Sequence, residues 1–331
     1  MPKFFKLLFY SIMISGSIIS ISSLSWFCAW IGLEINLLSF IPLMKTNKNK
    51  FSAESTSKYF LTQAMASFIL LFSIILFTNS KEFNFEYNYM SSILMNSAIL
   101  MKMGAAPLHF WLPEVASGLS WNSNLILLTW QKIAPMILVS YLNLINSLMI
   151  LFIIYSSIIG SLGGLNQICM RKILAYSSIN HVSWMLSSLL CSMNTWIIYF
   201  LVYSFTNMVI IQTLKHWKIF FMSQMNNIKN KKKIIFMLNF FSLGGLPPFL
   251  GFLPKWITIN QLSNSLFFFI ATILILFTLI ALFFYLRISF SSMTMYTNTP
   301  THKTKNSSSL TLLDMLSLIS MPTSLIMIFM L

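Results

Sequence analysis

Charged residues are scarce in this sequence of 331 residues, and acidic residues are the scarcest, with six Asp and Glu against 21 Lys and Arg. Only 8% of the residues are charged, whereas 57% are hydrophobic and the mean hydropathy is +0.78. A domain folded in water needs a surface rich in charged and polar side chains, which this composition does not supply. The composition therefore excludes a soluble globular protein and favours one that lies within a membrane.

Cysteines, histidines and glycine-rich motifs give no sign of a metal, disulfide or nucleotide site. The three cysteines lie in apolar runs and the four histidines are scattered: Cys28, Cys169, Cys191, His109, His181, His216 and His302. Their spacing matches neither a zinc site nor an iron–sulfur site nor a disulfide framework. No G-x-G-x-x-G motif follows a strand pattern. We therefore expect no metal and no cofactor in this chain itself.

Long uncharged runs predict helices that cross a bilayer. Such runs extend over residues 7–33, 59–80, 133–170, 173–214, 234–254 and 256–286. A spanning helix needs about 20 apolar residues, so each run of about 40 residues must fold back as two helices. We predict an all-α polytopic membrane protein with about eleven transmembrane helices, centred near residues 14, 34, 69, 99, 132, 154, 181, 204, 245, 274 and 320.

The basic residues support this count. If the predicted helices alternate in direction, 17 of the 21 basic residues fall on the side of the N-terminus, and Lys81 alone falls on the other side. This asymmetry agrees with the positive-inside rule. The 17 residues are Lys3, Lys6, Lys45, Lys48, Lys50, Lys58, Arg171, Lys172, Lys215, Lys218, Lys229, Lys231, Lys232, Lys233, Arg287, Lys303 and Lys305.

Two basic clusters have alternative interpretations. Lys3 and Lys6 before an apolar run resemble the start of a signal peptide, but no A-x-A-like end follows, so we expect a retained first helix. The cluster at 229–233 has the charge to bind nucleic acid or anionic lipid. No aromatic residues interleave with its charges, so we interpret it as a loop that sets the orientation in the membrane.

Four charged residues lie inside apolar segments: Glu34, Lys102, Lys132 and Lys255. Unpaired and facing lipid, they would together cost on the order of 10–14 kcal/mol, at about 2.5–3.5 kcal/mol each. We therefore expect them to face the interior of the helix bundle. One carboxylate cannot neutralise three ammonium groups, so some lysine must titrate or be hydrated, which is the chemistry of a proton relay. A purely structural salt bridge is the alternative for Glu34.

Histidines near these groups have more than one interpretation. His181 lies in the apolar seventh predicted helix, and the ordinary pKa of a histidine, about 6.5, suits it to carry a proton. A neutral histidine hydrogen-bonded to Ser or Tyr is the alternative. His109 and Glu114 fall at the loop-side end of the fourth predicted helix, where we expect structural roles.

Glycine and proline interrupt two predicted helices. The fourth reads MKMGAAPLHFWLPE and breaks near residues 104–113, and the ninth reads SLGGLPPFLGFLPK and breaks near residues 244–254. Such breaks are tolerated in a membrane where protein or water satisfies the freed carbonyl groups. The breaks are five predicted helices apart, so the two helices run in opposite directions, as in inverted repeats of transporters. We predict one membrane domain, 1–331, with five-helix halves at 7–144 and 145–288 and a final helix at 306–331.

Five stretches resemble, in order, the antiporter-like proton-pumping subunits of respiratory complex I, in the short eleven-helix form of animals. They read WIGLEINLLSFIPL, ILMKMGAAPLHFWLPEV, LTWQKIAPM, GGLNQICMRKILAYSSINHVSW and SLGGLPPFLGFLPKW. A composition with far more Lys than Arg, and with abundant Ile, Phe, Asn and Met, is typical of an A+T-rich organelle genome such as those of insects.

The resemblance implies candidate relay residues. It implies that Glu34 pairs with Lys102, and that Lys132 stands on a central hydrophilic axis. It places Lys255 at the second broken helix. Together with His181, these residues would relay protons or charge, coupled to quinone reduction elsewhere in the complex.

The resemblance also implies a location and partners. It implies a multi-pass subunit of NADH:ubiquinone oxidoreductase in the mitochondrial inner membrane, with the N-terminus and the basic loops on the matrix side. Its partners would be other membrane-arm subunits and phospholipids, cardiolipin among them, and not nucleic acid. NADH, flavin, iron–sulfur clusters and ubiquinone would bind to other subunits, so redox catalysis would belong to the assembly.

Two other functions stay open on the sequence alone. A subunit of a multisubunit cation/proton antiporter would share the broken helices and the buried lysines. A purely structural membrane-arm subunit would use the lysines only to hold helices together. Co-purification with NADH:ubiquinone activity distinguishes the first alternative, and substitution of Lys132 by Met distinguishes the second.

Overall fold

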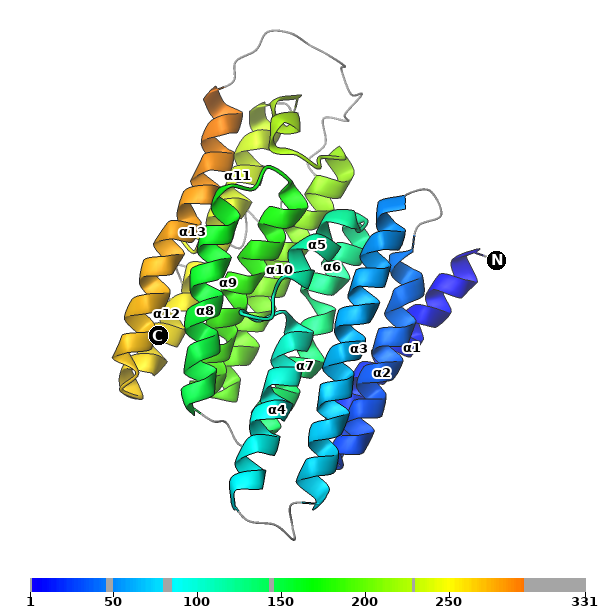
Figure 1. The fold of residues 1–331 in the computed structure, drawn as a ribbon. Coiled ribbons are helices and arrows are strands. Elements are labelled where there is room, and N and C mark those ends of the chain that lie inside the picture. The colour runs from blue at the N-terminus through cyan, green and yellow to red at the C-terminus, as the bar shows by residue number, and fades with distance from the viewer. Residues whose placement is uncertain (1, 46–49, 80–84, 143–145, 228–229, 295–331) are drawn as a thin grey trace. The chain divides into compact units, whose positions relative to one another are not determined.

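The computed structural model describes residues 2–45, 50–79, 85–142, 146–227 and 230–294, and these residues form a set of α-helices (Figure 1). Apart from one isolated bridge between Cys169 and Phe221, this part of the chain contains no β structure. The prediction of an all-α polytopic fold is confirmed. The chain divides into two compact units, Met1–Phe152 and Ile153–Leu331.

Unit 1 contains the first helices of the chain. They are α1 (Pro2–Ser22), α2 (Trp26–Met44), α3 (Lys50–Asn79), α4 (Phe85–Met103), α5 (Trp111–Gly118), α6 (Trp121–Leu128) and α7 (Trp130–Tyr141). The boundary between the units falls within α8 (Asn146–Leu165). Unit 2 continues with α9 (Met170–Cys191), α10 (Met193–Trp217), the short 3₁₀ helix η2 (Met222–Asn227), α11 (Asn230–Gly244), α12 (Phe252–Asn264) and α13 (Phe268–Thr294).

In the part of the chain that the structure describes, six helices are long and apolar enough to cross a membrane: α1, α2, α3, α8, α10 and α13. As predicted, the span near residue 245 is interrupted, between α11 and α12, and so is the span near residue 99, between α4 and α5. The predicted span near residue 132 is also divided, into α6 and α7. The predicted span near residue 181 is a single helix, α9, with a polar composition. The predicted final helix at 306–331 lies outside the described residues.

Several basic residues begin helices where the sequence suggests loops. The helix α3 starts at Lys50, so Lys50 and Lys58 both lie on it, and α11 starts at Asn230, just before three consecutive lysines. The uncharged runs used for the prediction end at the first charged residue. A charged residue does not end a helix, because the helical hydrogen bonds are made by the backbone. Its long side chain can extend to polar surroundings while the helix continues.

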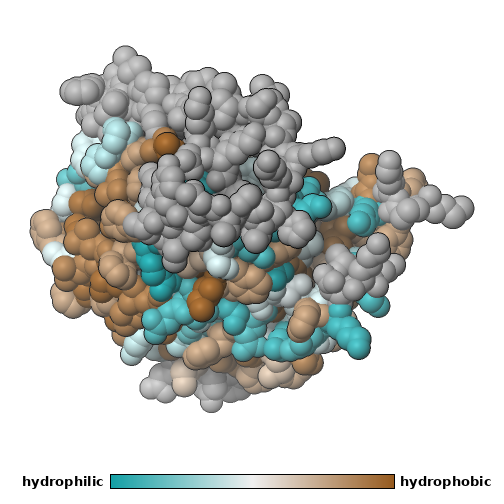
Figure 2. Space-filling view, turned by 90° about the horizontal axis from the view of Figure 1, so that it is seen from above, coloured by the Kyte–Doolittle hydropathy of each residue, from teal (hydrophilic) through white to brown (hydrophobic). Residues whose placement is uncertain are grey.

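The outer side of α3 shows why these helices suit a lipid environment. Leu61, Met65, Phe68, Phe72 and Ile75 are all exposed, and their spacing of three and four residues places them on one face of the helix. Figure 2, which looks down on the ends of the helices, shows hydrophobic residues gathered on the left-hand side, which is the side of α13 in Figure 1, and many hydrophilic residues among the coloured ones that face the viewer. An apolar side and a polar end are what a bilayer selects.

The helix α9 buries polar residues without leaving their hydroxyl groups unsatisfied. Ser177, Ser178, Ser183, Ser187 and Ser188 are all buried. Each donates its hydroxyl hydrogen to the backbone carbonyl three residues earlier, at 2.6–2.8 Å. Local bonds of this kind satisfy a serine wherever the helix lies. A helix with this composition can therefore be surrounded by other helices rather than by lipid.

The first break, between α4 and α5, is stabilised by local backbone bonds. Gly104 has a φ of +74°, a left-handed conformation that glycine adopts without a steric penalty. The N–H of Gly104 donates to the carbonyl of Met101 at 3.1 Å, and the N–H of Ala105 donates to that of Leu100 at 3.1 Å. These bonds end α4 in the manner of a Schellman motif.

The second break, between α11 and α12, repeats this pattern 141 positions later in the chain. Gly245 also has a φ of +74°, and its N–H donates to the carbonyl of Ser242 at 3.1 Å. The N–H of Leu246 donates to the carbonyl of Phe241 at 3.3 Å. Both breaks also contain a cis peptide bond before a proline, at Pro107 and Pro248. The two breaks thus have the same spacing between glycine and proline and the same backbone geometry.

A third interruption, which the sequence analysis missed, separates α6 from α7. Thr129 leaves helical geometry, with φ −114° and ψ −74°, and its hydroxyl donates to the carbonyl of Leu125 at 2.7 Å. Pro135 lies inside α7 and lacks the N–H that would bind the carbonyl of Gln131. In the two predicted breaks a proline follows a glycine within three residues, whereas no glycine precedes Pro135 in this way, which is why the pattern gave no break here.

Glycines bring α1 and α2 close together. A Cβ atom added at Gly16 would lie 2.9 Å from the backbone nitrogen of Asn36 and 3.0 Å from the carbonyl oxygen of Gly32. One added at Gly32 would lie 2.6 Å from the nitrogen of Ser20 and 2.8 Å from the oxygen of Gly16. The contacts are with backbone atoms, which cannot move aside as a flexible side chain can.

We predict that Gly32→Ala lowers the free energy of unfolding by about 1–3 kcal/mol, because the added methyl group would push the two backbones apart. The measurement is the thermal midpoint of the protein in detergent. Leu38→Ala, at an exposed position of the same helix, serves as the control. An unchanged midpoint for Gly32→Ala would show that α1 and α2 do not pack at this distance.

Candidate functional site

The three lysines of the apolar segments are buried within the bundle. Lys102, Lys132 and Lys255 are only 7%, 1% and 8% exposed. The side chain of Glu34 is 24% exposed. The lysines therefore lie in the protein interior, as their charge requires, and not against lipid.

In unit 1, Glu34 and Lys102 form an ion pair between α2 and α4. The Lys102 Nζ lies 3.7 Å from the Glu34 Oε1. The pairing is the one that the resemblance implies. The carbonyl groups at the end of α4 are also satisfied by side chains. The Gln63 Nε2 donates to the carbonyl of Lys102 at 3.4 Å, and the Trp111 Nε1 donates to that of Met101 at 3.1 Å.

Lys102 shares a small cavity with Lys132. The cavity has a volume of about 20 Å³, which is enough for one water molecule. Its lining comes from α2, α3, α4, α5, α6 and α7 and comprises Leu33, Asn36, Leu37, Tyr59, Gln63, Lys102, Met103, Trp111, Leu112, Leu127, Gln131, Lys132 and Pro135. A water molecule needs two to four polar partners, and this lining provides amide and ammonium groups. The cavity can therefore connect the two lysines by hydrogen bonds.

The interruption after α6 places Lys132 in the first turn of a new helix. The N–H of Lys132 donates to the carbonyl of Thr129 at 3.2 Å, which closes the turn that starts α7. Pro135 follows in the next turn and lines the same cavity. Because Pro135 has no N–H, the first turns of α7 have fewer backbone bonds than a continuous helix, and water can satisfy such backbone groups within a membrane.

In unit 2, Lys255 donates a hydrogen bond to the end of the broken helix. The Lys255 Nζ lies 2.8 Å from the carbonyl oxygen of Gly244, the last residue of α11. The carbonyl groups at a helix C-terminus carry partial negative charge, so they attract an ammonium group. The same Nζ lies 5.9 Å from the ring centroid of Trp184, within the range of a cation–π contact.

Unit 2 offers Lys255 no carboxylate among its described residues. The sequence contains neither Asp nor Glu between Glu114 and Asp314, and Asp314 lies beyond the described part of the chain. A backbone carbonyl and an aromatic ring therefore take the place that Glu34 has beside Lys102. Both are neutral, so they hold a proton on the lysine less tightly than a carboxylate does.

His181 lies among tyrosines in unit 2. The residue is buried, and its Nδ1 lies 2.8 Å from the hydroxyl oxygen of Tyr199. Its ring centroid lies 4.9 Å from that of Tyr203. The bond to a tyrosine is the arrangement expected of a buried neutral histidine. It also supplies a partner with which a proton could be exchanged, since the direction of the bond depends on the tautomer.

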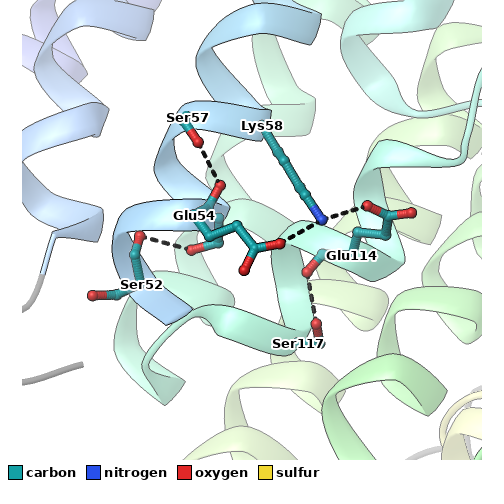
Figure 3. Close-up of polar contacts among 7 residues, drawn as sticks. Ser52, Glu54, Ser57, Lys58, Glu114 and Ser117 are labelled. Atoms are coloured by element: carbon teal, nitrogen blue, oxygen red, sulfur yellow. Dashed lines mark hydrogen bonds and ion pairs between the residues drawn. The ribbon is translucent and has the colours of Figure 1, made fainter. Parts of the chain in front are cut away.

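His109 and Glu114 have structural contacts in the loop and helix after the first break. The Nδ1 of His109 lies 3.2 Å from the carbonyl oxygen of Pro107. Glu114 accepts a bond from Lys58 at 2.9 Å, and Lys58 also contacts Glu54 at 2.9 Å (Figure 3). These three side chains are 41–60% exposed, so the cluster joins α5 to α3 but contributes little to stability.

The structure thus brings Glu34, Lys102 and Lys132 together in unit 1. It adds polar neighbours that the sequence analysis did not single out: Asn36, Gln63 and Gln131 in unit 1, and Trp184 and Tyr199 in unit 2. Asn36 and Gln131 stand within two positions of Glu34 and Lys132 in the sequence, which was a weak signal, whereas nothing in the sequence marked Gln63 or Tyr199. Among the described residues, no three His, Cys, Asp or Glu side chains gather as they would around a metal ion.

Comparison with known proteins gives a consistent result. Residues 23–281 match the model of the membrane domain of the NADH:quinone oxidoreductase/Mrp antiporter family. The chain is 51% identical to NADH-ubiquinone oxidoreductase chain 2 of Anopheles gambiae over 296 residues, which cover 88% of this chain and 86% of the relative. It is 47% identical to the protein of the same name from Locusta migratoria, with the same coverage.

Solved structures share the fold. A chain of respiratory complex I from Thermus thermophilus, solved with bound aureothin, superposes with a TM-score of 0.86 at 20% identity, over 98% of this chain and 78% of that one. A chain of the Mrp complex from Dietzia superposes with a TM-score of 0.75 at 16% identity, over 84% of this chain and 58% of that one.

We predict that Gly245→Ala disturbs the Lys255 site. The added Cβ would lie 2.8 Å from the Cδ and 2.9 Å from the Nζ of Lys255, and alanine is strained at a φ of +74°. The expected loss of stability is about 1–3 kcal/mol, measured as a lower thermal midpoint.

The neighbouring change Gly244→Ala is the control, because its Cβ would meet nothing closer than 3.5 Å. Equal effects of the two changes would contradict the close approach of Lys255 to Gly245.

Proposed function

Since the chain belongs to the NADH:quinone oxidoreductase/Mrp antiporter family, we propose that it is an antiporter-like subunit in the membrane arm of NADH:ubiquinone oxidoreductase, complex I. In this role it relays protons or charge across the membrane. The relay is coupled to quinone reduction, which takes place in other subunits. NADH, flavin, iron–sulfur clusters and ubiquinone bind there, and this chain carries out no redox chemistry itself.

The observation that carries the proposal is a cavity that connects the Glu34–Lys102 ion pair with a second buried lysine, Lys132. Lys102 lies 3.7 Å from Glu34 and lines the same cavity as Lys132. Two amino groups then line one cavity, and one of them is paired with a carboxylate, so a proton added to one lysine is disfavoured by charge on the other. A change in the Glu34–Lys102 pair therefore changes how readily Lys132 binds a proton. This coupling is the elementary step of a relay.

In unit 2 the proposed relay residues are His181 and Lys255. A histidine bonded to a tyrosine and a lysine bonded to a helix-terminal carbonyl are each able to accept and release a proton, because neither partner is charged. The helix breaks beside Lys102 and Lys255 support this proposal, since freed backbone carbonyls can bind water within a membrane.

We further propose that the two halves are inverted repeats, with residues 7–144 and 145–288 as five-helix halves and residues 306–331 as an added helix. The support is the agreement of the two breaks, which place glycine and proline at equal spacing and make the same backbone bonds. Folds of this kind place their ion sites at discontinuous helices.

The relatives support a proposal for the location and the partners. We propose that the chain lies in the mitochondrial inner membrane and contacts other membrane-arm subunits and phospholipids, including cardiolipin. The excess of basic residues on the side of the N-terminus supports an orientation with that side toward the matrix. The identity of 51% to an insect complex I subunit favours this assembly over a cation/proton antiporter, since the chain of the Mrp complex is only 16% identical.

We predict that Lys132→Met in the assembled complex abolishes proton pumping or lowers it at least tenfold, because methionine fills similar space but binds no proton. The measurement compares proton uptake into vesicles with NADH oxidation in the same preparation. Lys215→Met, at an exposed position of α10, is the control. Normal pumping and normal quinone-coupled turnover with Lys132→Met would leave only a structural role for this lysine.

We predict that Glu34→Gln and Lys102→Met are not additive. Each single change leaves a buried or half-buried charge without its partner and should lower the free energy of unfolding by about 1–3 kcal/mol. The double change removes both charges and should cost less than the sum of the single changes. The measurement is the thermal midpoint together with proton pumping.

The control is Glu54→Gln, which weakens an exposed pair and should change the free energy of unfolding by less than about 1 kcal/mol. Full additivity of Glu34→Gln and Lys102→Met, in stability and in pumping, would show that the two side chains act independently.

A further inference from the structure

An amide bridge crosses unit 1 beside the two lysines. The Gln131 Nε2 donates to the Asn36 Oδ1 at 2.9 Å and so links α7 to α2. Asn36 is 3% exposed. Both residues line the cavity that Lys102 and Lys132 share, and Gln63 contributes a third carboxamide to that lining. Three amides around a cavity for one water molecule are more polar groups than the packing of apolar helices requires.

The chemistry of an amide differs from that of a carboxylate in one respect that matters here. A carboxamide donates and accepts hydrogen bonds but stays neutral at every physiological pH. It can solvate an ammonium group and can equally solvate the amine that remains after the proton leaves. A carboxylate in the same place would hold the proton on the lysine.

The titratable groups that bear on the cavity are few. They are Tyr59 of α3, Lys102 of α4 and Lys132 of α7, together with Glu34 of α2, which contacts Lys102. The helices α1 and α6 also pack against α7, but they add no titratable side chain to the lining within the described residues. The amides of Asn36, Gln63 and Gln131 line the cavity beside these titratable groups and carry no charge.

We propose that Gln131 and Asn36 are positioning residues for proton transfer. Their bridge holds α7 against α2, and their uncharged amide groups line the water site between Lys102 and Lys132. This inference rests on the proposed function. It assigns the bridge a part beyond packing, because the neutrality of the amides keeps the proton mobile between the two lysines.

The test is the pH dependence of proton pumping by the assembled complex with Gln131→Glu. Glutamate has nearly the same shape as glutamine, and the amide of Asn36 can turn to donate to it. A carboxylate here should hold a proton on the adjacent lysines, so the pH at which pumping is half-maximal should rise by about one unit or more. Pumping at pH 7 should then fall by about tenfold.

A second variant keeps the test informative if Gln131→Glu fails to assemble. Asn36→Asp retains the acceptor of the 2.9 Å bond and places its charge on α2 instead. It should move the profile in the same direction. The matched control is Gln224→Glu, which exchanges the same groups at an exposed position on η2. It should leave the profile unchanged.

The outcomes separate the two proposals. If Lys132→Met stops pumping while Gln131→Glu and Asn36→Asp assemble with an unchanged pH profile, the amide bridge only packs helices, and the present inference fails while the proposed function stands. If Lys132→Met pumps normally, the proposed function fails first. A shifted profile for both amide variants, with an unchanged control, supports the inference.

Discussion

An ammonium group inside an apolar bundle is the constraint on which the rest of this structure depends. A buried charge is tolerated only with a partner, and the two units supply that partner differently. Lys102 has the carboxylate of Glu34 at 3.7 Å, whereas Lys255 has the backbone carbonyl of Gly244 at 2.8 Å. The first partner is charged and the second is a dipole. The two lysines of the proposed relay are therefore stabilised by different kinds of partner in the two units.

The helix breaks serve this same constraint. Within a continuous helix each carbonyl group already accepts a backbone hydrogen bond, whereas the last carbonyl groups of a helix have no such partner. Ending α11 at Gly244 frees the carbonyl that Lys255 uses, and the left-handed Gly245 leaves room for the lysine. In unit 1 the carbonyl groups of Met101 and Lys102, near the end of α4, accept bonds from Trp111 and Gln63, and Lys102 is paired with the carboxylate of Glu34.

Much of the fold could be predicted from the sequence because it follows from local chemistry. Uncharged runs longer than a bilayer is thick must form several spanning helices, and glycine with proline marks two of the breaks at the residues where they occur. The resemblance to complex I subunits is confirmed by the family match over residues 23–281. The break at Thr129 was missed because Pro135, without a neighbouring glycine, is also compatible with a kinked but continuous helix.

For the candidate site, the sequence by itself determined which charged groups must face the protein interior. An ionised side chain within an apolar segment is costly when it faces lipid, whatever the rest of the fold is. Glu34, Lys102, Lys132 and Lys255 were identified in this way. Only the tertiary structure decided what faces them. Asn36 and Gln131 are 95 positions apart in the chain, and Trp184 is far from Lys255. Neutral side chains carry no penalty large enough to reveal their place in advance, so helix packing alone brings them to the charges.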